Sequence, residues 1–261
     1  MRKVAVVGNT KLTQMCLDQY LLANTEVCCL YSLTKEATLK KVNGIDLQDF
    51  SDQNNIVHID GDWEIFNKEC IRLGVEIIFV LGDSRIVPKM IIDNFPMVIG
   101  NHGALLPSIK GGASLVWGRM LNLGYWGVSL FQITEKIDDG PILGTQVFTY
   151  KPMSNMQDFV AAADKHTVLL LKKVCEKLTK HEKLDKISNE KWHVKIAKHA
   201  DEETVCRIVK DLMKNNMNVY LPPRNLADCD IGNSWAEEFK YCFKAANASP
   251  YPNWKQNDKG L

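Results

Sequence analysis

Short apolar runs alternate with helix-like segments along the first 150 residues of the chain. Apolar residues that recur three or four positions apart predict helices over Leu12–Leu22 and Trp63–Leu73, the second ending at Gly74 with a left-handed cap. Continuous apolar runs, typical of strands covered on both faces, predict strands at Val4–Val7, Val27–Tyr31, Ile56–Ile59, Val75–Leu81 and Met97–Ile99. This order predicts a doubly wound α/β fold with a mostly parallel sheet and its site at the carboxyl ends of the strands.

The pattern changes after Gly124. Two strands are expected, at Val128–Ile133 and Gln146–Tyr150, on either side of a turn-rich stretch. Ser154 and Gln157 have the spacing of a capping box, which predicts the start of a long helix that reaches about residue 178.

A lysine-rich stretch at 180–186 has the composition of a solvated linker. Beyond it, helical spacing near Glu202–Asn215 and Ser234–Ala245 predicts a small α+β carboxyl-terminal domain. We therefore expect two domains, at residues 1–180 and 187–261.

Composition narrows the class of protein. Apolar residues make up 46% and charged residues 24%, and the net charge is +1, so no global field attracts nucleic acid or anionic lipid. No apolar run approaches the roughly 20 residues of a membrane span, and the first one is too short for a signal peptide. We predict a cytoplasmic protein whose eight cysteines, none in a C-x-x-C motif, are reduced thiols. No cluster of histidine, cysteine or carboxylate has metal-ligand spacing, so we expect no metal.

The candidate chemistry lies between residues 99 and 143. His102 follows a predicted strand, Asn101 precedes it, and Asp138 and Asp139 occupy a tight turn. An imidazole oriented by a carboxylate, with an amide donor beside it, suits acyl transfer. From the residues alone, a structural histidine at a strand end is the alternative.

The motifs of this stretch resemble the folate-dependent formyltransferase family. They are His102-Gly103-Ala104-Leu105-Leu106-Pro107, Lys110-Gly111-Gly112, Gly127-Val128 and Ile137-Asp138-Asp139-Gly140-Pro141-Ile142. The resemblance covers about residues 1–180, and within it Leu81–Pro88 is a weaker match. It implies that the formyl donor is N10-formyltetrahydrofolate and the acceptor is an amine.

The resemblance also implies catalytic roles. His102 would support charge and move protons, Asp138 would orient His102, and Asn101 would donate to the oxyanion. The family usually has asparagine two positions before the histidine, where this chain has Gly100. We expect the strand end to bend so that Asn101 takes the role; a different donor or weakened catalysis is the alternative.

The same resemblance implies the binding residues. The pterin ring would lie between the loop containing Gly82, Asp83, Ser84, Ile86 and Val87 and the turn containing Ile137, Asp139 and Gly140. The turn after the first strand lies at a helix amino terminus and consists of Gly8, Asn9, Thr10 and Lys11. Such a turn suits the binding of a phosphate on the acceptor; the alternative is a tight turn with no ligand.

Three acceptors are natural for such an enzyme. The first is phosphoribosylglycinamide, whose enzymes resemble residues 1–180 but leave the tail at 187–261 unexplained. The second is methionyl-tRNA, which the mixed charge of this tail suits poorly. The tail resembles that of enzymes that formylate nucleotide-linked amino sugars, through Asp228-Cys229-Asp230-Ile231-Gly232-Asn233-Ser234, Lys244-Ala245-Ala246 and Pro250-Tyr251-Pro252. We therefore predict a nucleotide-linked amino-sugar N-formyltransferase that binds no nucleic acid and no membrane, and leave a homodimer open. The alternatives are a methionyl-tRNA or other small-amine formyltransferase, and a catalytically impaired folate or sugar-nucleotide binding protein.

Overall fold

The structure is a computed structural model that describes residues 1–41, 43–180, 186–189, 193–197, 201–224, 228, 230–232, 234–248 and 255–256. Parts of the predicted tail motifs, at Cys229, Asn233 and 250–252, lie outside the described residues, as do residues 181–185 of the predicted linker.

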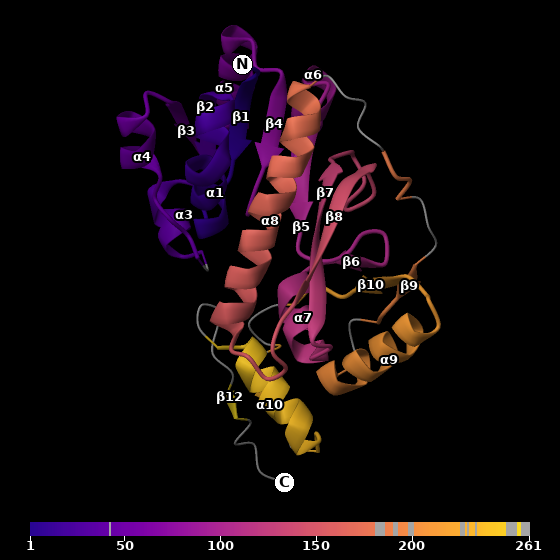
Figure 1. The fold of residues 1–261 in the computed structure, drawn as a ribbon. Helices are drawn as coiled ribbons and strands as arrows, with labels where there is room; N and C mark the ends of the chain where they lie inside the picture. Colours follow the sequence, from indigo (N-terminus) through magenta and orange to yellow (C-terminus); the bar gives the residue numbers. More distant parts are fainter. Residues whose placement is uncertain are drawn as a thin grey trace. The chain divides into compact units, whose positions relative to one another are not determined.

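A seven-stranded sheet organises the chain in the order β3-β2-β1-β4-β5-β7-β8 (Figure 1). The pairs β1–β2, β2–β3, β1–β4 and β4–β5 are parallel, which confirms the predicted mostly parallel sheet. The chain runs from β1 to β2 on one side and later returns to β4 on the other, so the loops after β1 and β4 meet at a topological switch point. The strands are β1 (Lys3–Val7), β2 (Glu26–Ser32), β3 (Val57–Asp60), β4 (Ile77–Val80), β5 (Val98–His102), β7 (Tyr125–Gln132) and β8 (Ile142–Thr149).

Helices connect these strands. The predicted helix at Trp63–Leu73 is confirmed as α5: Asp62 caps its first turn through the N–H groups of Glu64 and Ile65, and Gly74 ends it at φ +70°. The predicted helix after β1 is a helical stretch with a π-helical turn in its middle, made of α1 (Lys11–Cys16), η1 (Leu17–Leu21) and α2 (Leu22–Asn24). Three short helices were not predicted from the sequence: α3 (Lys35–Leu39), α4 (Gln48–Gln53) and α6 (Lys89–Asn94).

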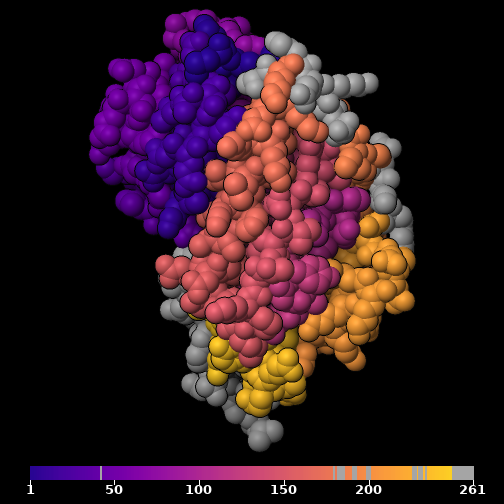
Figure 2. All heavy atoms as spheres, viewed as in Figure 1, coloured from indigo at the N-terminus to yellow at the C-terminus, as the bar shows by residue number. Residues whose placement is uncertain are grey.

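The long predicted helix is α8 (Met156–Thr179), and one of its sides is exposed along its length (Figure 2). The predicted capping residue is wrong. Asn155 caps the helix, because its Oδ1 accepts the N–H of Asp158 at 2.7 Å, whereas the hydroxyl of Ser154 has no hydrogen-bond partner among the residues that the structure describes. The buried side of α8 carries Met156, Phe159, Ala163, Leu170, Leu171 and Val174.

The chain forms two compact units whose members do not follow chain order. The first contains residues 1–101, 130–144 and 167–187, and the second contains residues 102–129, 145–166 and 188–261. The domain boundary at 180–187 stays a prediction.

A buried cluster on β1, β2, β4 and α5 forms a core of the first unit, with the rings of Tyr31 and Trp63 stacked at 4.1 Å. The second unit contains a parallel three-stranded sheet in the order β6-β10-β9. It also contains α7, which packs against α9 and α10, and a small β11–β12 pair. Their bounds are β6 (Ile109–Gly111), α7 (Ser114–Leu121), β9 (Val194–Lys195), α9 (Glu202–Lys214), β10 (Val219–Leu221), β11 (Asp230–Ile231), α10 (Glu237–Ala246) and β12 (Lys255–Gln256).

Candidate functional site

Two glycines let the loops after β1 and β4 touch at the switch point. A Cβ atom on Gly8 would lie 2.2 Å from the carbonyl oxygen of Leu81, and one on Gly82 would lie 2.0 Å from Oγ1 of Thr10. Gly82 also has φ +70°, which an L side chain adopts with difficulty. Both positions therefore require glycine, and the two loops form one surface at the carboxyl edge of the sheet.

The polar groups of the predicted phosphate turn are bound within the protein. The backbone N–H groups of Gly8, Thr10 and Lys11 donate to Tyr31 O, Thr13 Oγ1 and Asn43 O at 2.9, 3.1 and 3.3 Å. Asn9 is fully buried. A phosphate at this turn would have to displace these hydrogen bonds, and the assignment of residues 8–11 to the acceptor stays a prediction.

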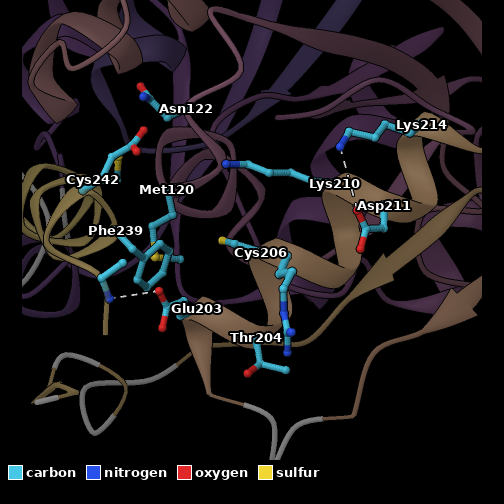
Figure 3. Close-up of a pocket in the computed structure, with 13 residues that line it drawn as sticks. Met120, Asn122, Glu203, Thr204, Cys206, Lys210, Asp211, Lys214, Phe239 and Cys242 are labelled. Atoms are coloured by element: carbon cyan, nitrogen blue, oxygen red, sulfur yellow. Dashed lines mark hydrogen bonds and ion pairs between the residues drawn. The ribbon is translucent and has the colours of Figure 1, made fainter. Parts of the chain in front are cut away.

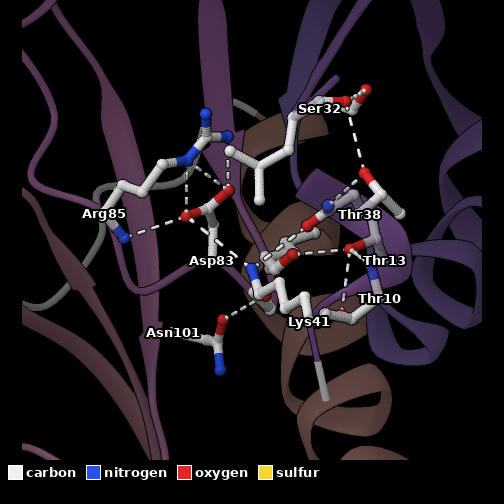
Figure 4. A network of polar contacts seen from close by, with 12 residues as sticks. Thr10, Thr13, Ser32, Thr38, Lys41, Asp83, Arg85 and Asn101 are labelled. Carbon is white, nitrogen blue, oxygen red and sulfur yellow. Dashed lines mark hydrogen bonds and ion pairs between the residues drawn. The ribbon is translucent and has the colours of Figure 1, made fainter. Parts of the chain in front are cut away.

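Lys41 joins these two loops, and no sequence pattern singled it out (Figure 4). Its Nζ donates to Oδ1 of Asn9 at 3.1 Å and to the carbonyl oxygen of Gly82 at 3.3 Å, and it lies 4.0 Å from the carboxylate of Asp83. Burial lowers the pKa of Lys41, and the charge of Asp83 acts in the opposite direction. The ammonium group thus holds Gly82 from its carbonyl side.

Asp83 and Arg85 hold the rest of the loop after β4. The carboxylate of Asp83, only 1% exposed, accepts hydrogen bonds from the backbone and the guanidinium of Arg85. That guanidinium also lies over the rings of Tyr31 and Trp63, at 4.8 and 5.5 Å from their centroids. Burial raises the pKa of Asp83, but Arg85 and Lys41 lower it by more, so the net pKa lies below its usual value and the group stays ionised.

The loop after β4 exposes apolar surface where the pterin ring was predicted. Ile86 is 72% exposed and Val87 is buried, and in the second predicted loop Ile137 is 58% exposed. Lys89, just after the first of these loops, forms an ion pair with Glu135 in the second. The two loops are therefore neighbours in the first unit, each with an exposed isoleucine.

The turn at 137–140 has a constrained backbone. Asp138 has φ +52°, a left-handed conformation that is uncommon outside glycine, asparagine and aspartate. A Cβ atom on Gly140 would lie 1.7 Å from the carbonyl oxygen of Gln132, so glycine is required there. Asp138 and Asp139 are both half-buried.

Asn101 contacts the loop that Lys41 and Asp83 hold. Its Oδ1 accepts the backbone N–H of Gly82 at 2.9 Å (Figure 4). Because a backbone N–H can only donate, the oxygen end of the amide must face Gly82, and the NH₂ end points elsewhere. No acceptor among the described residues receives a hydrogen bond from this NH₂ group.

The predicted strand at Met97–Ile99 extends further than expected, so that Asn101 and His102 are its last residues. β5 pairs with β4 from Val98 to Gly100 and ends at His102. The side of β5 occupied by position 100 is filled by packing, because a Cβ atom there would lie 2.9 Å from Cδ1 of Ile133 and 3.4 Å from Phe131. Glycine at 100 is therefore explained by Ile133 and Phe131.

His102 begins the second unit and is buried. Its Nε2 lies 3.1 Å from the carbonyl oxygen of Ile109. Since that oxygen only accepts, this hydrogen bond requires a proton on Nε2.

β7 holds the loop after His102. The hydroxyl of Ser129 donates to Ala104 O at 2.7 Å and accepts the N–H of Leu106 at 2.9 Å, while the indole N–H of Trp126 donates to Gly103 O at 2.7 Å. Asn101 and Asp138 belong to the first unit. The joint action of Asn101, His102 and Asp138 stays a prediction.

Comparison with known proteins decides the family. The formyl transferase family model matches residues 2–174. The chain belongs to the formyl transferase family. The match spans every residue predicted for the formyltransferase site, from the turn after β1 to the turn at 137–140.

Three relatives show how far the likeness extends. A methionyl-tRNA formyltransferase from Mycoplasma genitalium is 27% identical over 172 residues, which are 64% of this chain and 55% of that protein, so the chain spans about half its length. A 4-N formyltransferase from Francisella tularensis has a TM-score of 0.70 at 16% identity, covering 99% of this chain and 93% of that one. HypX from Aquifex aeolicus in complex with tetrahydrofolic acid has a TM-score of 0.65 at 12% identity, and the match covers 94% of this chain and 34% of HypX. The solved structures confirm the fold.

Two further findings concern the described part of this family member. Its helices include none that is long and apolar enough to cross a membrane. Within the same residues, no three histidine, cysteine or carboxylate side chains lie together in a way that could hold a metal ion.

Proposed function

We propose that the protein transfers a formyl group from N10-formyltetrahydrofolate to the amine of a nucleotide-linked amino sugar. The observation that carries the transfer reaction is the Asn101 amide. Its oxygen is held by Gly82 and its NH₂ group donates to no described residue, within a chain whose motifs match the formyl transferase family. An amide fixed in this way is a preorganised donor for a developing oxyanion.

The residues of the first unit fit a folate. A pterin ring needs apolar cover on its faces and hydrogen-bonding groups at its edge. Ile86 and Ile137 offer exposed apolar side chains on neighbouring loops, and the backbone of residues 82–85 is held rigid by Lys41, Asp83 and Arg85. Bound there, the folate would present its formyl group on N10 as the electrophile.

In the proposed reaction the amine nitrogen of the acceptor bonds to the formyl carbon, and the bond from that carbon to N10 breaks. Asn101 donates from Nδ2 to the formyl oxygen while that oxygen carries negative charge. His102 takes a proton from the attacking amine at Nδ1, and the proton leaves on the departing N10. Asp138 stabilises the imidazolium form of His102.

Two observations support an amino-sugar acceptor. The likeness to the Francisella tularensis 4-N formyltransferase runs through almost the whole of both chains, including the residues after 180. Between Glu202 and Lys214 the helix α9 has three carboxylates and three cations, so it offers no net positive charge to the phosphates of a tRNA. The matches to methionyl-tRNA formyltransferases, of which the Mycoplasma genitalium one covers 64% of this chain, favour tRNA as the second candidate.

The test is a panel of acceptors incubated with N10-formyltetrahydrofolate and read by mass spectrometry. We expect a one-formyl increase on nucleotide-linked 3- or 4-amino sugars and none on methionyl-tRNA. Formylation of methionyl-tRNA alone, with tight salt-sensitive tRNA binding, would replace the sugar with tRNA. Folate binding without transfer to any acceptor would identify a catalytically impaired binding protein instead.

A further inference from the structure

A cavity lies entirely within the second unit, and none of the residues assigned to formyl transfer lines it. Its volume is about 670 Å³, and its walls come from the end of α7, one face of α9 and one face of α10 (Figure 3). This volume is within the range of cavities that bind small molecules. Met120 and Phe239 give it an apolar wall.

Three cations and three carboxylates line this cavity, and they are unevenly paired: Arg207, Lys210, Lys214, Glu203, Asp211 and Glu238. Asp211 lies 3.9 Å from Lys214, and Glu203 accepts the N–H of Ala236 at 3.0 Å. Lys210 has no ion pair with any described carboxylate, and its ammonium group points toward the end of the cavity where Asn122 and Cys242 lie (Figure 3). Among the described residues Arg207 has no ion pair either, and the third lining carboxylate, Glu238, is exposed.

A further cation, Arg119, is not a lining residue but contacts Asn122 at the same end of the cavity. Its side chain is completely buried, and its guanidinium donates to Ser154 O and, at 3.3 Å, to Oδ1 of Asn122. Within the described part of the chain its Nη2 has no hydrogen-bond partner, and no carboxylate there lies within ion-pair distance. A buried charge without a counter-charge is costly, so an anion close to it is strongly favoured.

The guanidinium reaches the cavity wall through Cys242. Burial raises the pKa of the Cys242 thiol, Arg119 and Lys210 act to lower it, and Glu238 acts to raise it. Two cations and one carboxylate are therefore close to this lining residue. Burial also raises the pKa of Cys206 on the same wall. Both thiols stay protonated, so neither is a reactive thiolate, and the charged side chains are the groups that could bind a ligand in this cavity.

We propose that this cavity binds a small phosphate monoester, with the phosphate between Lys210 and the Asn122–Cys242 end and an apolar group against Met120 and Phe239. A phosphate suits this end because Lys210 and the buried Arg119 lie near it and have no described carboxylate within ion-pair distance. The proposal does not depend on formyl transfer, since none of these residues belongs to the proposed reaction.

The test uses the full chain and phenyl phosphate as the probe, titrated by calorimetry at constant ionic strength. We expect saturable one-to-one binding, weaker binding of inorganic phosphate and none of phenol. The Lys210→Gln variant should weaken phenyl phosphate binding by at least about tenfold, because it removes a charged donor. Lys214→Gln is the matched control, since Lys214 is already paired with Asp211, and it should change the affinity by less than about twofold.

Backbone amide shifts in the wild-type protein locate the probe without any variant. Shifts on α9, α10 and the end of α7 support the proposal. Three results overturn it: no saturation by about 10 mM phenyl phosphate, equal binding by wild type and by a folded Lys210→Gln variant, or shifts confined to the turn at residues 8–11.

Discussion

Replacing Asn101 tests the oxyanion donor and separates it from the anchoring of the loop after β4. The amide has two ends with different roles: Oδ1 anchors Gly82 at 2.9 Å, and Nδ2 is proposed to donate to the formyl oxygen. Asn101→Asp keeps an acceptor for Gly82 but removes every donor, whereas Asn101→Ala removes both.

The two ends predict different magnitudes. Loss of one oxyanion donor lowers kcat by about 10²–10³, or about 2.7–4 kcal/mol of transition-state stabilisation. Loss of the hydrogen bond to Gly82 costs about 1 kcal/mol of folding free energy. Asn101→Asp should therefore lose kcat with little change in urea stability, and Asn101→Ala should lose both. The acceptor's KM should stay nearly constant, as expected for an interaction made in the transition state.

The assay is steady-state transfer to the acceptor identified by the panel, with urea unfolding of each variant in parallel. Asn94→Ala is the matched control, because Asn94 is exposed and bonds only Asn67 among the described residues. A kcat within about twofold of wild type for Asn101→Asp and Asn101→Ala would refute the assignment of the donor.

Three further outcomes are expected. His102→Ala and Asp138→Ala should each lower kcat by about 10²–10⁴ with unchanged circular dichroism, and near-wild-type turnover would remove that residue from the mechanism. Gly100→Asn should destabilise the protein by about 1–3 kcal/mol without raising kcat, because its Cβ would meet Cδ1 of Ile133 at 2.9 Å; higher activity at full stability would contradict the packing argument. Asp83→Asn should lower the free energy of unfolding at pH 7 by about 3 kcal/mol, since it leaves a partly buried Arg85 without its carboxylate. Because the folded pKa of Asp83 is depressed, its contribution is present above the unfolded pKa of about 3.9 and is lost as the pH falls through the folded value, so the difference between wild type and variant should shrink below about pH 4 in acid-unfolding curves.

Local patterns determined the elements of the fold. α5 could be predicted because its apolar face, its start and its glycine cap all lie within about a dozen consecutive residues. The parallel strands were recognisable because strands covered on both faces are apolar throughout. The capping residue of α8 could not be chosen from the pattern, since Ser154 and Asn155 are both good caps and only the path of the backbone selects one.

The sequence alone determined the fold class, the parallel sheet and the residues that carry the family motifs. Only the tertiary structure decided what surrounds them. It placed Gly82 between Asn101 and Lys41, residues 60 positions apart in the chain, and so oriented the amide. It also buried Arg119 without a described counter-charge, although α7 is an ordinary apolar helix in sequence. Hydrogen bonds and desolvation act between groups that the fold brings together, so no local periodicity along the chain records them.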